Sequence, residues 1–545
     1  MFNQLIKLTA ITLLFISFAS CKHDHGYKSI TDCEIKAFYK DLPFEMPVLK
    51  VPQFKKYSVK ITDFGAIGDG VTLNTDAFAK AIDQVHAKGG GRVIVPRGIF
   101  LTGPIVMKSN VNLFLERNSM ILFSSDFDLY PIVDASFEGL NTKRCQSPIS
   151  AHGAENIAIT GYGVIDGSGD AWRPTKREKL TDRQWRKLVN SGGVTDSLQK
   201  IWYPSESSIR GQAYCVDQNV PVGLQTDEEW AAIRDFLRPV LLNFVKCKNI
   251  LLEGVTFQNS PAWNLHPLMS ENIIINRLTV RNPRYSQNGD GVDIESCKNT
   301  LIVNSSFDVG DDAICMKSGK NETGRARAMP TENVIVANCV VYHGHGGFVV
   351  GSEMSGDVRN ISVKHCSFIG TDVGLRFKSN RGRGGVVENI WISHINMINI
   401  PTDPLTFNLY YGGKSAIEAI DAGDDPSAEA AKVPPVTIET PAFRNIFISD
   451  IVSNGSNRPM YFNGLPEMKV ENVVIENSIF NARYGAEISR AKGVTISNVI
   501  LDVENGEALV LEDVDGLNIS RLTDPAGNKI IIRQKGTNNN LNFKD

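Results

Sequence analysis

A short motif recurs along this chain: an asparagine, an apolar residue, any residue, and a second apolar residue. The copies are NIAI at 156, NILL at 249, NIII at 272, NTLI at 299, NVIV at 333, NISV at 360, NIWI at 389, NIFI at 445 and NVVI at 472, followed by GVTI at 493 and GLNI at 516. From 249 onward, successive copies stand 21 to 34 residues apart, except for one gap of 56. A repeat of this length with alternating apolar residues predicts a solenoid of stacked strands. A chain of 545 residues would by its length alone be expected to form roughly three or four domains. Because of the repeat, we expect one all-β domain over residues 51–545 instead.

The positions after each motif predict what fills the solenoid. Six residues after the asparagine the side chain is small or apolar, as at Val255, Cys339 and Cys366, and eight residues after it is often aromatic, as at Phe257 and Phe307. Strand alternation would place these rows inside. We expect the two cysteines to serve as small core residues rather than as a disulfide. The nine cysteines show no CxxC pair, so neither a zinc site nor a redox motif is predicted.

Two segments depart from the repeat. The stretch NTDAFAKAIDQVHAKGGGR, residues 74–92, predicts an amphipathic helix that would cap the open N-terminal end of the solenoid. Residues 170–240 are rich in charge and tryptophan and predict a mainly helical insertion beside the coils. An insertion of this kind would close one end of a groove, but the sequence does not place it.

The N-terminus predicts export. The apolar run ITLLFISFAS after Lys7 is too short to span a membrane and reads as a signal peptide over residues 1–20. Ser20-Cys21 resembles a bacterial lipoprotein box, which implies a lipid anchor on Cys21, a linker over 21–50, and a place in the cell envelope, in the periplasm or at the cell surface. Cleavage by an ordinary signal peptidase is the alternative. Lys plus Arg number 57 against 60 for Asp plus Glu, and this balance predicts no nucleic-acid partner.

A second strand in each coil ends at a serine. The segments are GDGVDIES, DDAICMKS, GGFVVGS and VGLRFKS, and they align Ser296, Ser318, Ser352 and Ser379. Residues two and four before each serine are apolar and would face inward. Those one and three before it would face outward, which displays Glu295, Asp293, Lys317, Lys378 and Arg376.

The same register places ionisable side chains at the starts of these strands. Asp290 and Asp312 both stand six residues before their serine, and Asp311 and His345 both stand seven before theirs. Because neighbouring coils stack about 4.8 Å apart, we expect three carboxylates and an imidazole to meet at one groove. Like charges so close raise each other's pKa and keep a proton in the cluster. Taken singly, each aspartate beside a glycine would more often be a turn former. We expect Asp311 and Asp312 at the groove rim.

Four of these segments resemble a known family. NGDG at 288–291, GDD at 310–312, GHG at 344–346 and RFK at 376–378 are similar to the motifs of glycoside hydrolase family 28, the polygalacturonases, in which NTD normally stands where this chain has Asn288-Gly289-Asp290. The resemblance implies a right-handed parallel β-helix. It also implies hydrolysis of α-1,4-linked galacturonate with inversion, for which an acid and a base about 6.5–9.5 Å apart are typical.

The resemblance also implies roles for the residues. Asp311 would be the proton donor, Asp290 and Asp312 would activate water, and His345 would help to keep Asp311 protonated. Arg376 and Lys378 would bind the substrate carboxylate. The family also uses a downstream tyrosine, and alternation along DPLTFNLYY favours Tyr410 over Tyr411.

We expect pectic polysaccharide or oligogalacturonide as substrate, no metal or other cofactor, and a monomer. Rhamnogalacturonan or xylogalacturonan hydrolysis within the family stays open, as does exo against endo cleavage. A calcium-dependent β-helix pectate lyase and a non-catalytic β-helix adhesin or tailspike-like binder are the alternatives from other classes.

Overall fold

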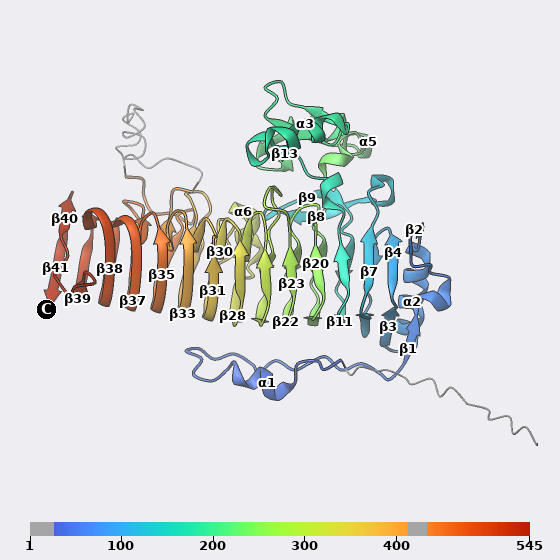
Figure 1. The fold of residues 1–545 in the computed structure, drawn as a ribbon, viewed down its shortest axis with the longest axis horizontal. Coiled ribbons are helices and arrows are strands. Elements are labelled where there is room, and N and C mark those ends of the chain that lie inside the picture. The colour runs from blue at the N-terminus through green and yellow to red at the C-terminus, as the bar shows by residue number, and fades with distance from the viewer. Residues whose placement is uncertain (1–26, 412–432, 545) are drawn as a thin grey trace, which may run out of the picture.

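The computed structural model describes residues 27–411 and 433–544. These residues wind into a right-handed parallel β-helix, in which each turn adds a strand to three parallel ladders (Figure 1). The fold class predicted from the repeat is confirmed. The predicted signal peptide and the predicted lipid-anchor site at Cys21 lie outside the described residues. None of the helices in the described part has the length and apolar character to cross a membrane.

The first ladder contains the strands that carry the repeated motif, together with the strands stacked before and after them. They are β1 (Ser58–Lys60), β3 (Gly91–Val95), β6 (Val111–Leu115), β11 (Glu155–Gly161), β19 (Lys248–Glu253), β22 (Glu271–Asn276), β25 (Lys298–Val303), β28 (Thr331–Ala337), β31 (Val358–Ile369), β33 (Val386–Ile400), β35 (Ala442–Ser456), β37 (Val470–Ser489), β38 (Ala491–Glu512), β39 (Asp515–Thr523) and β41 (Asn539–Lys544). Ile250 pairs with Ile273 and Ile273 with Thr300, so the predicted register of the motif is confirmed there.

The second ladder lies beside the first. Its separate strands are β2 (Asp69–Leu73), β4 (Gly98–Thr102), β7 (Ser119–Phe123), β12 (Val164–Asp166), β20 (Thr256–Gln258), β23 (Thr279–Arg281), β26 (Ser306–Asp308) and β29 (Val340–His343). From β31 onward, one long strand continues from the first ladder into the second.

The third ladder carries the serine-aligned segments. Its strands are β5 (Ile105–Val106), β10 (Ile149–His152), β18 (Leu242–Val245), β21 (Leu265–Leu268), β24 (Val292–Glu295), β27 (Asp312–Lys317), β30 (Gly346–Gly351), β32 (Val373–Lys378), β34 (Leu405–Asn408), β36 (Met460–Asn463), the ends of β37 and β38, and β40 (Ile532–Lys535). Ile294 pairs with Met316 and Gly351 with Lys378, as the serine alignment predicts.

The asparagines of the motif explain why the turns stack in register. Asn249 and Asn272 have φ of 56° and 59°, a left-handed conformation that asparagine tolerates better than other non-glycine residues. The side-chain amide of Asn249 donates to Asn156 at 3.1 Å, that of Asn272 to Asn249 at 3.0 Å, and that of Asn299 to Asn272 at 3.2 Å. Each asparagine therefore both forms a turn and bonds to the turn before it.

The interior is the apolar column that the sequence predicts. Val255, Phe257, Phe307, Cys339 and Cys366 are all buried in it. The eight described cysteines are free thiols, so the prediction that Cys339 and Cys366 are core residues is confirmed. The helix α2 (Thr75–Ala87) closes the N-terminal end with Phe78, Ile82 and Val85 against this column (Figure 1).

The N-terminal segment lies along the outside of the first ladder. It contains α1 (Asp32–Ala37), and Figure 1 shows it running beside the coils. Ile30, Ile35 and Leu49 pack against strand residues that include Leu251 and Ile274. Most of the segment assigned to a linker therefore contacts the β-helix.

The insertion rises from the side of the third ladder (Figure 1). It contains three short helices, α3 (Asp182–Asn190), α4 (Glu206–Gln212) and α5 (Asp227–Ala231). Small antiparallel pieces join them: β13 (Thr175–Lys176), β14 (Val194–Thr195) and β15 (Ile201–Tyr203), then β16 (Cys215–Asp217) and β17 (Val220–Pro221). A hairpin without a counterpart in the sequence pattern, β8 (Ile132–Phe137) and β9 (Leu140–Cys145), lies beneath it (Figure 1). A further helix, α6 (Asn321–Arg327), follows β27.

Candidate active site

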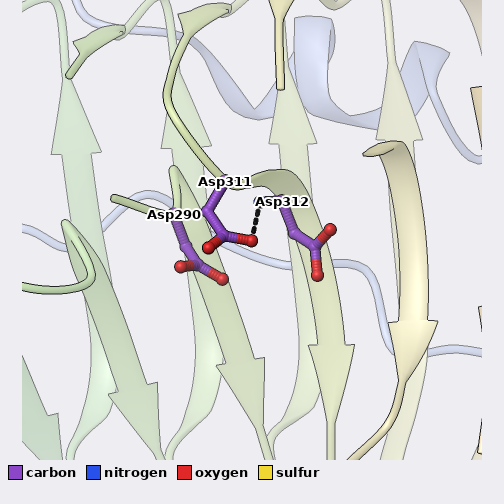
Figure 2. A group of neighbouring side chains, drawn as sticks. All are labelled: Asp290, Asp311 and Asp312. Atoms are coloured by element: carbon purple, nitrogen blue, oxygen red, sulfur yellow. Dashed lines mark hydrogen bonds between the residues drawn. The ribbon is translucent and has the colours of Figure 1, made fainter. Parts of the chain in front are cut away.

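Three aspartates meet where two strands of the third ladder begin. Asp290 precedes β24, Asp311 precedes β27 and Asp312 starts it. The backbone N–H of Gly291 donates to the carbonyl of Asp312 at 2.9 Å, which locks the two coils in register. One carboxylate oxygen from each aspartate lies within 4.8 Å of those of the other two (Figure 2). The structure thus brings together the three carboxylates that the register predicted.

His345 joins this cluster from the next coil. Its backbone N–H donates to the carbonyl of Asp311 at 2.9 Å, and its Nδ1 lies 3.1 Å from Asp311 Oδ1. Its Nε2 lies 3.8 Å from Asp372 Oδ2. These contacts hold the imidazole ring with Nδ1 toward Asp311. His345 thus lies beside Asp311, as the sequence predicts.

Arg376 and Lys378 reach back to Asp312. Lys378 Nζ lies 2.7 Å from Asp312 Oδ2, and Arg376 Nη1 lies 3.3 Å from Oδ1. Asp312 is 1% exposed. The expectation that Asp312 lies at the groove rim is therefore wrong, because the two cations draw its carboxylate under the surface. Asp311, whose side chain is 21% exposed, does lie near the opening.

The environments of the aspartates differ, and their pKa values separate accordingly. Burial, together with the charges of Asp293 and Asp311, raises the pKa of Asp290 well above its ordinary value. Burial would also raise the pKa of Asp311 and Asp312, but His345 outweighs it at Asp311 and the cations Lys378 and Arg376 outweigh it at Asp312, so both values are lowered. Of the three aspartates, Asp290 is therefore the one whose surroundings favour the protonated form, whereas His345 favours the ionised form of Asp311 and the two cations that of Asp312.

The two tyrosines take positions that alternation alone does not give. Tyr410 projects to Arg381, whose guanidinium carbon lies 5.3 Å from the ring centre, whereas Tyr411 lines the cavity beside Arg376 and Lys378. Strand β34 ends at Asn408, and the chain then turns, with the Asn408 side chain accepting from the N–H of Tyr410 at 2.8 Å. Past that turn the period-2 rule no longer applies, so the structure favours Tyr411 as the residue that faces the cluster.

The cluster opens into a cavity of 530 Å³. The β-helix supplies the aspartates, Lys317, Lys378, Glu353 and Trp263. The insertion supplies Tyr203, Gln212 and Asn219, among others, and the hairpin supplies Glu138. The insertion that the sequence could not place therefore forms part of the cavity wall.

An apolar partition closes one end of this cavity. Phe137, from the hairpin, packs on Trp263 with ring centres 5.0 Å apart, and Val240 and Ala262 complete the cluster. Phe137 and Val240 also line a second cavity of 320 Å³, whose floor is Ser150 and Asn243 of earlier strands in the same ladder. The hairpin thus divides what would otherwise be one groove along the third ladder.

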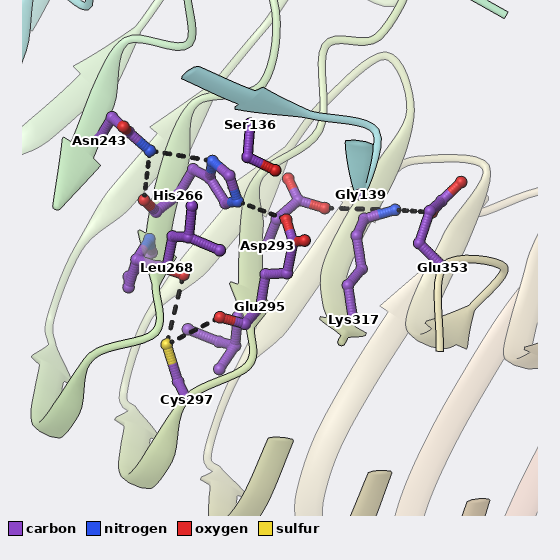
Figure 3. A network of polar contacts seen from close by, with 12 residues as sticks. Ser136, Gly139, Asn243, His266, Leu268, Asp293, Glu295, Cys297, Lys317 and Glu353 are labelled. Carbon is purple, nitrogen blue, oxygen red and sulfur yellow. Dashed lines mark hydrogen bonds and ion pairs between the residues drawn. The ribbon is translucent and has the colours of Figure 1, made fainter. Parts of the chain in front are cut away.

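A buried polar network supports this end of the site (Figure 3). Glu295 bonds His266 Nε2 at 2.7 Å and also pairs with Arg327, while Lys317 lies 2.9 Å from Glu353 and 3.6 Å from Asp293. The outward face that the sequence predicted for Asp293, Glu295 and Lys317 is correct, but the hairpin covers it. Sequence reasoning gave no role to Glu353, Glu138 or Asn219, because no local pattern connects the hairpin and insertion to the coils.

The aspartate cluster is a poor fit for a calcium ion. Calcium takes six to eight oxygen ligands, usually with uncompensated carboxylates. Here Lys378 and Arg376 already neutralise Asp312, and His345 neutralises Asp311. Cationic side chains therefore take the positions next to the carboxylates that a calcium ion would need.

Comparison with known proteins gives consistent matches. The model described as glycosyl hydrolases family 28 matches residues 234–419, and the one described as rhamnogalacturonase A/epimerase, pectate lyase-like, matches residues 58–131. A probable polygalacturonase of Vitis vinifera is 30% identical over 63% of this chain and 61% of its own length. An exo-poly-alpha-D-galacturonosidase of Dickeya chrysanthemi is 28% identical over 65% of this chain and 57% of its own length. The chain thus spans about three fifths of the length of these two relatives.

Among solved structures, a hyperthermoactive exopolygalacturonase from Thermotoga maritima is 31% identical. It aligns with a TM-score of 0.64 over 87% of this chain and 94% of its own. A family 28 exopolygalacturonase from Yersinia enterocolitica aligns with a TM-score of 0.66 at 24% identity, over 85% of this chain and 78% of its own, and it supports the fold.

Proposed function

Since this chain belongs to glycosyl hydrolase family 28, we propose that it hydrolyses α-1,4 linkages between galacturonate units of pectic chains. The observation that supports this most directly is the cluster of three aspartates in one cavity, with Arg376 and Lys378 paired to one of them, Asp312. Carboxyl groups can supply the acid and the base, and the cations can hold an anionic sugar. Incubation with polygalacturonate should release new reducing ends without ultraviolet absorbance. Absorbing, unsaturated products would indicate a lyase instead.

We propose that Asp311 donates the proton to the glycosidic oxygen and that Asp290 and Asp312 orient the attacking water. His345 would return a proton to Asp311 across their 3.1 Å contact. Arg376, Lys378 and a tyrosine, Tyr411 or Tyr410, would contact the substrate on one side of the cut. All of them except Tyr410 lie at or beside the cavity wall.

Inversion at the anomeric carbon is the stereochemical outcome that we propose, and it rests on the family resemblance. The closest carboxylate oxygens lie within 4.8 Å, nearer than the typical inverting distance of about 6.5–9.5 Å and close to the distance of about 5–5.5 Å that is typical of retention. Proton NMR of the first-formed product decides the matter: a β-configured anomeric centre would mean inversion, and an α-configured one retention.

We propose exo cleavage, because the partition of Phe137 and Trp263 blocks one end of the cavity. A chain could then enter only by its terminus. On a defined decagalacturonate, this predicts that the earliest products are a small end fragment and the chain shortened by that fragment, without fragments from cuts in the middle of the chain.

We propose that the protein is exported and held at the cell envelope by a lipid on Cys21, and that it acts as a monomer. The box Ser20-Cys21 supports the anchor. Metabolic labelling with a fatty acid should mark the wild type and leave Cys21→Ala unlabelled. Light scattering of the purified protein should give the mass of one chain.

A further inference from the structure

Lys317 is a buried cation that lines the cavity and has no part in the roles proposed above. It ends β27, the strand that Asp312 starts, and its side chain is 4% exposed. Its Nζ donates to Glu353 Oε2 at 2.9 Å and lies 3.6 Å from Asp293 Oδ1 (Figure 3). An ammonium group has three N–H donors, and the bond to Glu353 is the one that Nζ makes among the described residues.

The cavity therefore has two cationic positions, which lie beside different aromatic residues. Lys317 Nζ lies 4.8 Å from the ring centre of Trp263, which belongs to the partition. Lys378 Nζ and the guanidinium carbon of Arg376 lie 4.8 and 5.5 Å from the ring centre of Tyr411, which follows strand β34. The coils that carry Asp290 and Asp312 come between Trp263 and Tyr411 in the order of the solenoid.

The ion pairs of the two positions are separate. Lys378 pairs with Asp312, whereas Lys317 pairs with Glu353 and Asp293. Both oxygens of Asp293 are buried and accept no hydrogen bond within the described residues. Burial raises the pKa of Asp293 well above its ordinary value. Lys317 has Glu353 as its one hydrogen-bonded carboxylate among the described residues. It retains the capacity to bind a second carboxylate.

Building on the proposed hydrolysis of galacturonate chains, we propose that Lys317 binds the carboxylate of the chain-end sugar at the closed end of the cavity. Arg376 and Lys378 then bind the carboxylate of the sugar across the scissile bond. Each galacturonate unit carries one carboxylate, and rhamnose carries none. A rhamnose at either place would exclude water from the cation without offering it a carboxylate, which is costly. The site therefore selects linkages between two galacturonates over those of rhamnogalacturonan.

The test compares three substrates: trigalacturonate, and the same trimer methyl-esterified on the chain-end sugar or on the next sugar. Because a hydrogen bond to a charged group contributes roughly 1.5–3 kcal/mol, each ester should lower kcat/KM of the wild type by about 10- to 150-fold. Lys317→Met should remove the penalty of the end-sugar ester and keep the other. Arg376→Ala should do the converse, and Lys317→Arg should retain both penalties.

Lys298→Met is the matched control, because Lys298 pairs with Glu332 at 3.0 Å outside the cavity and should leave both penalties unchanged. If Lys317→Met does not fold, Lys317→Met/Glu353→Gln removes the unpaired charge and carries the same expectation. Equal losses on all three substrates for the folded Lys317 variant would overturn this inference alone. A wild type that cleaves none of them would overturn the proposed function as well.

Discussion

His345 and Asp311 belong to neighbouring turns of the β-helix and are joined twice. The backbone N–H of His345 donates to the Asp311 carbonyl at 2.9 Å, and its Nδ1 meets Asp311 Oδ1 at 3.1 Å. The hydrogen bond and charge of Asp311 raise the pKa of His345, and His345 lowers that of Asp311 despite burial. Both shifts favour the imidazolium and carboxylate forms of this pair, and the donor role proposed for Asp311 requires the proton to cross their contact.

The ion pair predicts a pH window of stability. A raised histidine pKa stabilises the fold fully below the unfolded value of about 6.5 and ceases to do so as pH rises through the folded value. A lowered aspartate pKa stabilises above the unfolded value of about 3.9 and ceases as pH falls through the folded value. We expect His345→Gln to lower Tm most between about pH 4 and 6.5. His343→Gln, at an exposed histidine beside Asp308, is the control. A Tm difference that does not vary with pH would mean that His345 acts through packing.

The acid and base assignments predict different responses to the leaving group. Asp311→Asn should lower turnover of pectic oligomers by about 10²- to 10⁴-fold, and a substrate with an activated leaving group should recover much of it. Asp290→Asn should lose activity on both substrates, because a better leaving group does not replace an oriented water. Rescue of Asp290→Asn alone would assign the donor role to Asp290, whose pKa is the raised one.

Replacing Arg376 and replacing Lys378 should affect the stability of the protein differently, although both side chains pair with Asp312. Lys378 is 8% exposed and bonds Asp312. Lys378→Ala therefore leaves the buried carboxylate of Asp312 without its nearest cation and should lower the free energy of unfolding by about 3–5 kcal/mol. Arg376, 20% exposed and 3.3 Å from Asp312, should mainly raise KM when replaced by alanine. Urea denaturation and kinetics on acid and esterified pectin measure both effects. Equal destabilisation by the two variants would contradict the geometry.

The partition predicts a change of cleavage mode. Replacing residues 135–141, the tip of the β8–β9 hairpin, by an Asn-Gly turn removes Phe137 and joins the two cavities. The variant should cut decagalacturonate internally and release fragments from mid-chain cuts at the earliest times, as chromatography would show. A deletion of similar size within α3, which does not line the cavity, is the control. Unchanged products from the hairpin variant would place the barrier elsewhere.

The sequence by itself determined the solenoid and most of the cluster. The asparagine motif repeats because each turn needs the same backbone geometry and the same bond to the turn before it. In a stacked fold, equal offsets along the sequence become neighbours in space. For this reason Asp290, Asp312, Asp311 and His345 could be brought together from their distances to a serine.

Only the tertiary structure decided which residues enclose that cluster and which charges surround its carboxyl groups. The hairpin tip with Phe137 and Glu138, and the insertion with Asn219, obey no repeat, so no register connects them to the coils. The burial of Asp312 and Lys317 depends on that cover and on side chains that reach across coils. Tyr411, rather than Tyr410, lines the cavity because strand β34 ends at Asn408, before both tyrosines. A period predicts positions along a strand, but burial, and with it the pKa of each carboxyl, depends on everything that packs around it.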